Sequence, residues 1–430
     1  MKKSLIALAA VAAVAAAQAQ ESSVTFYGIA DVAVGHVEHS LSVDPSFPAS
    51  VNPVSAVKTS VPNSVNGMFN GGISPSRWGV KGVEDLGGGM KAFFTLESGI
   101  NLPTGQLSNA GAALARNSGA PAGTGTASAN SSIDGQLFNR QAFVGLSDKD
   151  LGSIQFGRNY ASIFDIVVKY DPVQAAQLFS PLGFSGTIGG GGGVSEDTRM
   201  DGSIKYGNKI DKFNFGGFVK LGGVAGSNKT QSGYGVSVGY EEETFGVQFA
   251  YQGFYDALKA GTSAIVGDVN LTNYDTKAWM LAGRYTVEGF NLKAGWERYT
   301  LSKPSNSLNG NVGVVGNYYG LTVGNPNTVD FAKADQSTDV IWIGGDYNVA
   351  SNLNLSAGFY DQRANASSDL GQHDGNIYSA SVLLDYSLSK RTDVYGGLMY
   401  SKYSGDQYNP PVATVYSHNY ITAVGIRHRF

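Results

Sequence analysis

The chain has 430 residues, a formal net charge of −4, no cysteine, and charged side chains at only 15% of its positions, where about 25% is usual. Such a weakly acidic chain lacks the basic surface that nucleic-acid binding needs, so this class is excluded. Because no disulfide can contribute, stability must come from a large core or from a closed, hydrogen-bonded wall. The 58 glycines, 23 tyrosines and 21 phenylalanines are typical of aromatic-rich strands joined by polar turns.

The first residues have the pattern of an export signal. Lys2 and Lys3 precede an uninterrupted apolar stretch, which ends in the small-x-small sequence Ala17-Gln18-Ala19. We therefore predict a signal peptide at residues 1–19 and one β domain at residues 20–430. No later segment has the eighteen or so consecutive apolar residues of a membrane helix, so a mature chain inserted in a membrane would cross it with strands.

From Ser23 onward, segments of about ten residues alternate polar and apolar side chains, which predicts antiparallel strands. An even number is expected when both termini of a barrel lie on one side of the membrane. The sixteen predicted strands are 24–36, 76–86, 90–100, 138–147, 152–160, 199–208, 213–224, 234–242, 245–255, 274–286, 290–301, 339–348, 353–362, 377–388, 392–403 and 418–430.

The links between these strands are alternately short and long. Short links such as 87–89 and 148–150 are expected to be periplasmic turns, and long ones such as 41–75, 101–137 and 161–198 to be external loops. The rhythm predicts an all-β fold, a 16-stranded antiparallel transmembrane β-barrel with long external loops.

Side-chain alternation indicates which face of each strand meets lipid. In the strand predicted at 199–208, Met200, Ile204 and Tyr206 share one face and Lys205 lies on the other. The first set is expected to face lipid, and Lys205 to face water inside the barrel. Alternation alone also fits a soluble β-sandwich. The export signal, the many long strands and the aromatic residues near strand ends favour a membrane barrel.

Four stretches, at residues 24–32, 76–100, 138–160 and 423–430, resemble the Gram-negative general (diffusion) porin family, in particular its neisserial and β-proteobacterial-type branch. The resemblance implies a trimer of sixteen-stranded barrels in which the third external loop folds into the lumen. The terminal Phe430 resembles the aromatic signal that the barrel assembly machinery recognises. Phe430 also fits a second interpretation, an ordinary lipid-facing aromatic residue at the membrane interface.

The function implied is an outer-membrane porin, a water-filled channel for passive diffusion of ions and small hydrophilic solutes. Such a channel needs no catalytic group, metal or cofactor, only a constriction whose width and field sort solutes. The expected partners are two further copies of the chain in a homotrimer, outer-membrane lipid and lipopolysaccharide, the barrel assembly machinery, and the solutes and ions themselves.

Charged residues on the lumen face are the candidates for the constriction. Arg77 and Glu97 are predicted at similar heights on neighbouring strands, and Arg77 alternates with the lipid-type residues Trp78 and Val80. A charge on the lipid face would cost about 2–4 kcal/mol near the bilayer midplane, which favours the lumen for Arg77 and Glu97.

By resemblance, Arg77, Arg140 and Arg199 match the basic cluster of a porin constriction, and Lys205 extends it. Arg158 fits less well, because it has the parity of the lipid-type residues around it. Either a bend turns it inward or it lies in the headgroup zone and snorkels.

The third long link supplies acids, of which Asp165 and Asp171 are the better candidates for facing the basic wall. Opposite charges on wall and loop would create a transverse field across the lumen, with a weak preference for anions.

Three other functions are considered. The third long link also holds Phe164, Tyr170, Phe179 and Phe184, which could line a channel selective for a sugar or small organic acid, or could simply anchor the loop. An outer-membrane hydrolase is disfavoured because none of the five histidines lies in a recognisable catalytic or metal-binding motif. A secreted β-rich adhesin would be soluble without detergent.

Overall fold

The computed structural model describes residues 22–43, 64–107, 137–182, 199–223, 226–229, 232–259, 270–302, 317–318, 321–322, 336–366, 375–405 and 414–430. The signal peptide predicted at residues 1–19 lies outside these ranges. Within them, no helix has both the length and the apolar character required to traverse a bilayer.

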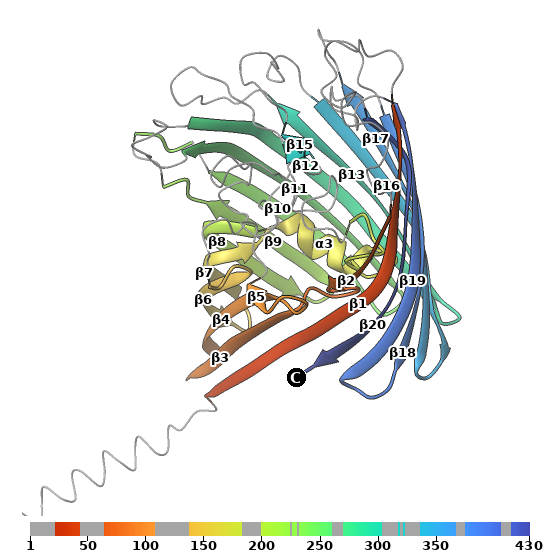
Figure 1. Ribbon diagram of the computed structural model, residues 1–430. Helices are drawn as coiled ribbons and strands as arrows, with labels where there is room; N and C mark the ends of the chain where they lie inside the picture. The colour runs from red at the N-terminus through yellow and green to blue at the C-terminus, as the bar shows by residue number, and fades with distance from the viewer. Residues whose placement is uncertain are drawn as a thin grey trace, which may run out of the picture.

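Sixteen antiparallel strands form a closed wall, in which each strand pairs with its neighbours in chain order (Figure 1). The last strand pairs with the first, from Ile29 opposite Arg429 to Val43 opposite Thr414. The predicted 16-stranded barrel is therefore confirmed. The wall strands are β1 (Ser23–Val43), β3 (Arg77–Gly87), β4 (Met90–Asn101), β6 (Gln141–Asp148), β7 (Gly152–Tyr160), β8 (Arg199–Ile210), β9 (Phe213–Lys220), β10 (Gly233–Glu241), β11 (Phe245–Lys259), β12 (Asn270–Val287), β13 (Phe290–Ser302), β16 (Gln336–Ala350), β17 (Leu353–Ala366), β18 (Gly375–Ser387), β19 (Thr392–Gly405) and β20 (Thr414–Arg429).

The two faces of the wall differ as the alternation predicts. Large apolar side chains such as Val34, Ile343 and Val424 are exposed on the outward face, whereas polar side chains such as Glu97 and Ser381 are buried on the inward face. An outward face of this kind suits the hydrocarbon of a bilayer, because the closed wall pairs its backbone groups internally.

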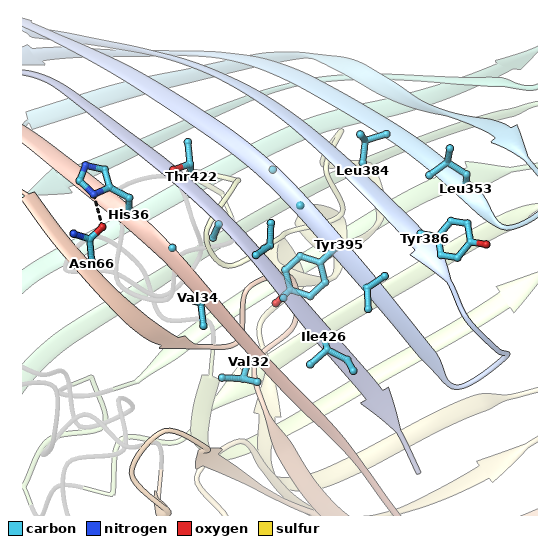
Figure 2. A pocket seen from close by; sticks show the side chains of 17 residues that line it. Val32, Val34, His36, Asn66, Leu353, Leu384, Tyr386, Tyr395, Thr422 and Ile426 are labelled. Carbon is cyan, nitrogen blue, oxygen red and sulfur yellow. Dashed lines mark hydrogen bonds between the residues drawn. The ribbon is translucent and has the colours of Figure 1, made fainter.

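Part of the outward face is hollowed. A shallow cavity of about 1140 Å³ lies over β1, β18, β19 and β20, and its lining includes Val34, Leu384, Gly396, Thr422 and Ile426 (Figure 2). Gly396 has no side chain and that of Thr422 is short, so the wall is thin at these positions. The hollow belongs to the apolar outer surface and not to the interior.

One predicted facing is wrong. Met200 does not face lipid but is fully buried in a cluster with Ala161, Phe218 and Phe254. The cause is a β-bulge, since two residues of β8, Asp201 and Gly202, lie opposite one residue of β7. A bulge reverses the alternation on either side of itself, so Met200 and Ile204 no longer share a face.

The first long link is also shorter than predicted. β1 continues to Val43, and a further strand, β2 (Ser64–Asn70), pairs with β1 within the range predicted as loop. The sequence SVNGMFN lacks clear alternation, so its extended form depends on the partner strand. Three other short strands also lie in predicted loops: β5 (Gln106–Leu107), β14 (Asn317–Tyr318) and β15 (Leu321–Thr322).

A helix, α3 (Ser162–Tyr170), follows β7 within the third long link and was not predicted. Its β-branched residues favour strands, but Ile163, Ile166, Val167 and Tyr170 have helical spacing and are all buried. They pack against wall strands from β9 to β13, and Figure 1 shows α3 within the ring of strands. The largest apolar cluster thus lies between residues 161–182, named here the inner segment, and the inward face of the wall.

Candidate functional site

Glu97 on β4 is the centre of a charged network on the inward face. Its carboxylate lies 2.6 Å from Nε of Arg140 and 3.9 Å from Nε of Arg77 on β3. The hydroxyl of Tyr27 on β1 donates a 3.0 Å hydrogen bond to the same carboxylate. Glu97 is almost completely buried, and its single carboxylate is shared by two guanidinium groups.

Tyr160, at the end of β7, extends this network to a third arginine. Nη2 of Arg140 donates a 2.7 Å hydrogen bond to the Tyr160 hydroxyl. The guanidinium carbon of Arg199 lies 5.5 Å from the centre of the Tyr160 ring, a cation–π contact. Among the described residues, no carboxylate lies within 4.0 Å of the Arg199 guanidinium. Arg77, Arg140 and Arg199 are named here the arginine cluster.

Asp165 and Lys205 join α3 to the arginine cluster. Nζ of Lys205 on β8 lies 2.6 Å from the Asp165 carboxylate and donates a 2.9 Å hydrogen bond to the backbone oxygen of Tyr160. The ring of Phe164 stacks on that of Tyr160 at 4.5 Å between ring centres. The beginning of the inner segment is therefore held beside the basic wall, and Asp165 is paired by a cation of that wall.

Arg158 makes its contacts with other residues of the protein. Its Nε and Nη2 both donate to the backbone oxygen of Asn139, and its Nη1 lies 2.5 Å from the Asp201 carboxylate. The residue is 5% exposed, which does not fit snorkelling into the headgroup zone. Arg158 ties the chain before β6 to the bulge of β8, and its charge is balanced by Asp201.

Gly157 is required at the irregularity next to Arg158. Its φ is +137°, and a Cβ there would lie 2.2 Å from the backbone oxygen of Ala142. We expect Gly157→Ala to reduce the free energy of unfolding by about 1–3 kcal/mol, the usual cost of such strain. Urea titration of the barrel in phospholipid bilayers measures this. Gly207→Ala on β8 is the matched control, because the nearest atom to its Cβ would be 3.9 Å away. Equal stabilities of the two variants would contradict this role.

Asp171 does not lie beside the basic wall, contrary to the sequence-based expectation. Its side chain is completely buried, with one carboxylate oxygen 2.6 Å from the hydroxyl of Tyr360 on β17 and the other 2.5 Å from the backbone nitrogen of Ala175. Nζ of Lys293 donates to its backbone oxygen. Burial raises the pKa of the Asp171 carboxyl, although the Tyr360 hydrogen bond opposes this. Asp171 ends α3 against the wall, which explains why it does not face the channel.

The aromatic residues of the inner segment also act as anchors. Tyr170 and Phe179 are completely buried. Nε1 of Trp342 on β16 donates a 3.0 Å hydrogen bond to the backbone oxygen of Tyr170, and the Phe179 ring packs where Gly397 on β19 has no side chain. Phe184 lies outside the described residues. Since the Tyr170 and Phe179 rings pack against the wall, these two residues do not contribute to a stacked path for a sugar.

Phe430 lies at the seam where the barrel closes. Its backbone nitrogen donates to the oxygen of Gly28 and its backbone oxygen accepts from the nitrogen of Gly28, while its ring stacks on Phe26 of β1. The ring is on the outward face and is 44% exposed. This position suits an interfacial aromatic residue and leaves the ring accessible.

Sequence reasoning missed two residues of the network, Tyr27 and Tyr160. The alternation of the first strand could have placed Tyr27 inward, because its neighbour Phe26 is a lipid-type residue. In the structure Tyr27 lies opposite Gly79, which itself lies opposite Glu97. The contacts of Tyr160 could not be found in this way. They depend on the irregular end of β7 and on a helix that was not predicted.

Comparisons with known proteins agree with this architecture. A family model described as Gram-negative porin matches residues 4–406. An outer membrane porin protein of Bordetella pertussis is 28% identical over 456 residues, covering 100% of both chains. Among solved structures, the anion-selective porin from Comamonas acidovorans has a TM-score of 0.62 at 20% identity, covering 95% of this chain and 100% of that one. The trimer form of OmpT from Vibrio cholerae has a TM-score of 0.55 at 15% identity, covering 95% and 99%.

Proposed function

The chain belongs to the Gram-negative porin family, and we propose that its arginine cluster and inner segment together form the constriction of the channel. As a member of that family it is an integral outer-membrane β-barrel that passes solutes by passive diffusion, and not an enzyme. The proposal concerns what sorts the solutes. We propose a weak preference for anions.

The balance of charge in the network is the observation that carries this proposal. Arg77 and Arg140 share one acid, Glu97, and Arg199 has no carboxylate within 4.0 Å among the described residues, whereas Lys205 is matched by Asp165 and Arg158 by Asp201. Among the described residues, the three arginines and one acid of the cluster therefore leave an excess of two positive charges. In a narrow, water-filled passage a fixed excess of one sign raises the local concentration of the opposite ion.

The solved porin from Comamonas acidovorans is described as anion-selective. At 20% identity that likeness speaks for the fold alone, so it is the arrangement of charges in this chain that supports the preference. For the alternative of a sugar-selective channel, Tyr170 and Phe179 offer no stacking surface because they are buried against the wall, and a stacked pair, Phe164 on Tyr160, lies beside the arginine cluster.

We further propose the assembly expected from the sequence. Residues 1–19 would be removed on export, residues 20–430 would form the barrel, and Phe430 would be read by the barrel assembly machinery. Three copies would associate, in contact with outer-membrane lipid and lipopolysaccharide. The trimer form of the OmpT structure supports the trimer by analogy of fold.

Planar-bilayer recording across a salt gradient tests these proposals together. Insertion of a trimer is expected to give conductance steps in multiples of three, and the reversal potential is expected to have the sign of anion preference. Single unitary steps would reject the trimer. A reversal potential of the opposite sign would reject the role of the arginine cluster.

A further inference from the structure

The second wall strand is interrupted at mid-height. β1 pairs with β2 through Val32–Glu38 and with β3 through Ser23–Ile29, so that β2 and β3 together occupy one position in the wall. Residues 71–76, between β2 and β3, leave the ladder, and Gly71, Gly72, Ile73 and Ser76 among them are buried. These six residues are named here the strand break.

The carboxylate of Asp31 on β1 holds the strand break in place. It accepts hydrogen bonds from three successive backbone N–H groups, those of Gly72 at 2.8 Å, Ile73 at 3.2 Å and Ser74 at 2.7 Å. The hydroxyl of Tyr395 on β19, labelled in Figure 2, donates a fourth at 2.5 Å. Asp31 is completely buried. Because unmade hydrogen bonds of buried groups are costly, this arrangement fixes the backbone of the strand break.

The strand break in turn holds the far end of the inner segment. The backbone nitrogen of Leu178 donates a 2.9 Å hydrogen bond to the oxygen of Gly72. Ile73, Leu178 and Phe179 belong to the same buried apolar cluster as Tyr395. A side chain at Gly72 would collide with the Tyr395 ring, since a Cβ there would lie 2.0 Å from its hydroxyl oxygen. The contact therefore depends on a glycine at this position.

The attachments of the inner segment to the wall include one near its beginning, one in its middle and one near its end. Asp165 is held by Lys205 near its beginning, Tyr170 and Asp171 by Trp342 and Tyr360 in its middle, and Leu178 by the strand break near its end. The attachments at the beginning and in the middle are made by side chains of wall strands, those of Lys205 on β8, Trp342 on β16 and Tyr360 on β17. The third is made through backbone that has left the wall. The Asp31 carboxylate accepts from three of its N–H groups, and Nη1 of Arg427 donates a 2.8 Å hydrogen bond to the Ser74 hydroxyl.

We propose that Asp31 is a positioning residue of the channel: through the strand break, its carboxylate holds the end of the inner segment against the wall. Neutralising Asp31 is expected to weaken four hydrogen bonds at once and to let the segment near Leu178 detach while α3 remains in place. The inference rests on the proposed function only in so far as the inner segment narrows the channel.

The absence of native cysteine allows a direct test by thiol labelling. Leu178→Cys, at a site 7% exposed, reports on detachment, and Val168→Cys, at an exposed site on α3, is the reference. A membrane-impermeant maleimide is applied to the folded barrel in lipid vesicles. Adding Asp31→Asn is expected to accelerate labelling at position 178 about tenfold, as expected for loss of charge-assisted hydrogen bonds, and to leave position 168 unchanged.

Asp339→Asn is the matched control, because Asp339 is a buried aspartate whose partners, Trp296 and Arg298, do not touch the strand break. It should leave labelling at position 178 unchanged. Equal labelling of Leu178→Cys with and without Asp31→Asn, in barrels that keep the electrophoretic mobility of the folded form, would overturn the proposal.

If Asp31→Asn does not assemble, Tyr395→Phe tests the proposal in its place. It removes one donor and is expected to accelerate labelling about threefold, and an unchanged rate would again overturn it.

Single-channel recording of the same variants separates this inference from the proposed constriction. If both hold, Asp31→Asn increases labelling and also adds sub-levels and current noise to the open channel. Faster labelling with an unchanged, quiet conductance would retain Asp31 as the positioning residue but place the inner segment away from the narrowest point.

Discussion

Arg199→Gln is expected to lower the anion-to-cation permeability ratio about fivefold, because a unit charge close to the ion path contributes about 1 kcal/mol in water-like surroundings. Arg199 is the member of the arginine cluster without a carboxylate partner among the described residues, and it contacts the ring of Tyr160. Its removal should therefore change the field with little structural disturbance. The reversal potential in a salt gradient, recorded at low ionic strength, measures the change.

Two controls accompany this experiment. Arg298→Gln removes an arginine that is paired with Asp339 at 2.7 Å and shares the outward face of β13 with Trp296, so the reversal potential should not change. Raising the salt to 1 M should reduce the effect of Arg199→Gln, because the screening length falls to about 3 Å. An unchanged potential for Arg199→Gln at low salt would place Arg199 away from the narrowest part of the channel.

Arg140→Gln is expected to destabilise the barrel by about 3 kcal/mol, because it leaves the buried Glu97 carboxylate without its closest cation. Arg77, at 3.9 Å, and the Tyr27 hydroxyl remain as partial compensation. The free energy of unfolding in urea, measured in phospholipid bilayers, tests this. The same variant should shift the reversal potential towards cations.

The double variant Arg140→Gln/Glu97→Gln identifies the cause of that destabilisation. With both charges removed, no unpaired carboxylate is left, and most of the lost stability should return. A double variant as unstable as Arg140→Gln alone would show that the packing of Arg140, and not the unpaired charge of Glu97, is responsible.

The barrel itself could be predicted from local sequence patterns. Alternation with period two follows from a wall that has lipid on one side and water on the other, and the rhythm of short and long links follows from strands that run up and down. Irregular backbone broke these rules. The bulge at Asp201 and Gly202 turned Met200 inward. Because of the strand break, β2 was interpreted as part of a loop. Neither the bulge nor the strand break has a periodic pattern in the sequence.

The candidate site was predicted in its members but not in its connections. Arg77, Glu97, Arg140 and Arg199 do come together. The tyrosines that join them and the buried position of Asp171 could not be foreseen. Helical spacing of the apolar residues in α3 was present in the sequence, but β-branched residues within a predicted loop concealed it.

Local sequence patterns were enough to predict the sixteen strands, the facing of their regular stretches and the charged residues offered to the lumen, because each of these depends on neighbours within about ten positions of the chain. Which of those charges remain unbalanced depends on tertiary contacts. Glu97 neutralises Arg140 only because β4 adjoins β6, and Arg158 meets Asp201 only at the bulge between β7 and β8. A charge's effect depends on distances to partners far away in sequence, and the closing of the barrel sets those distances.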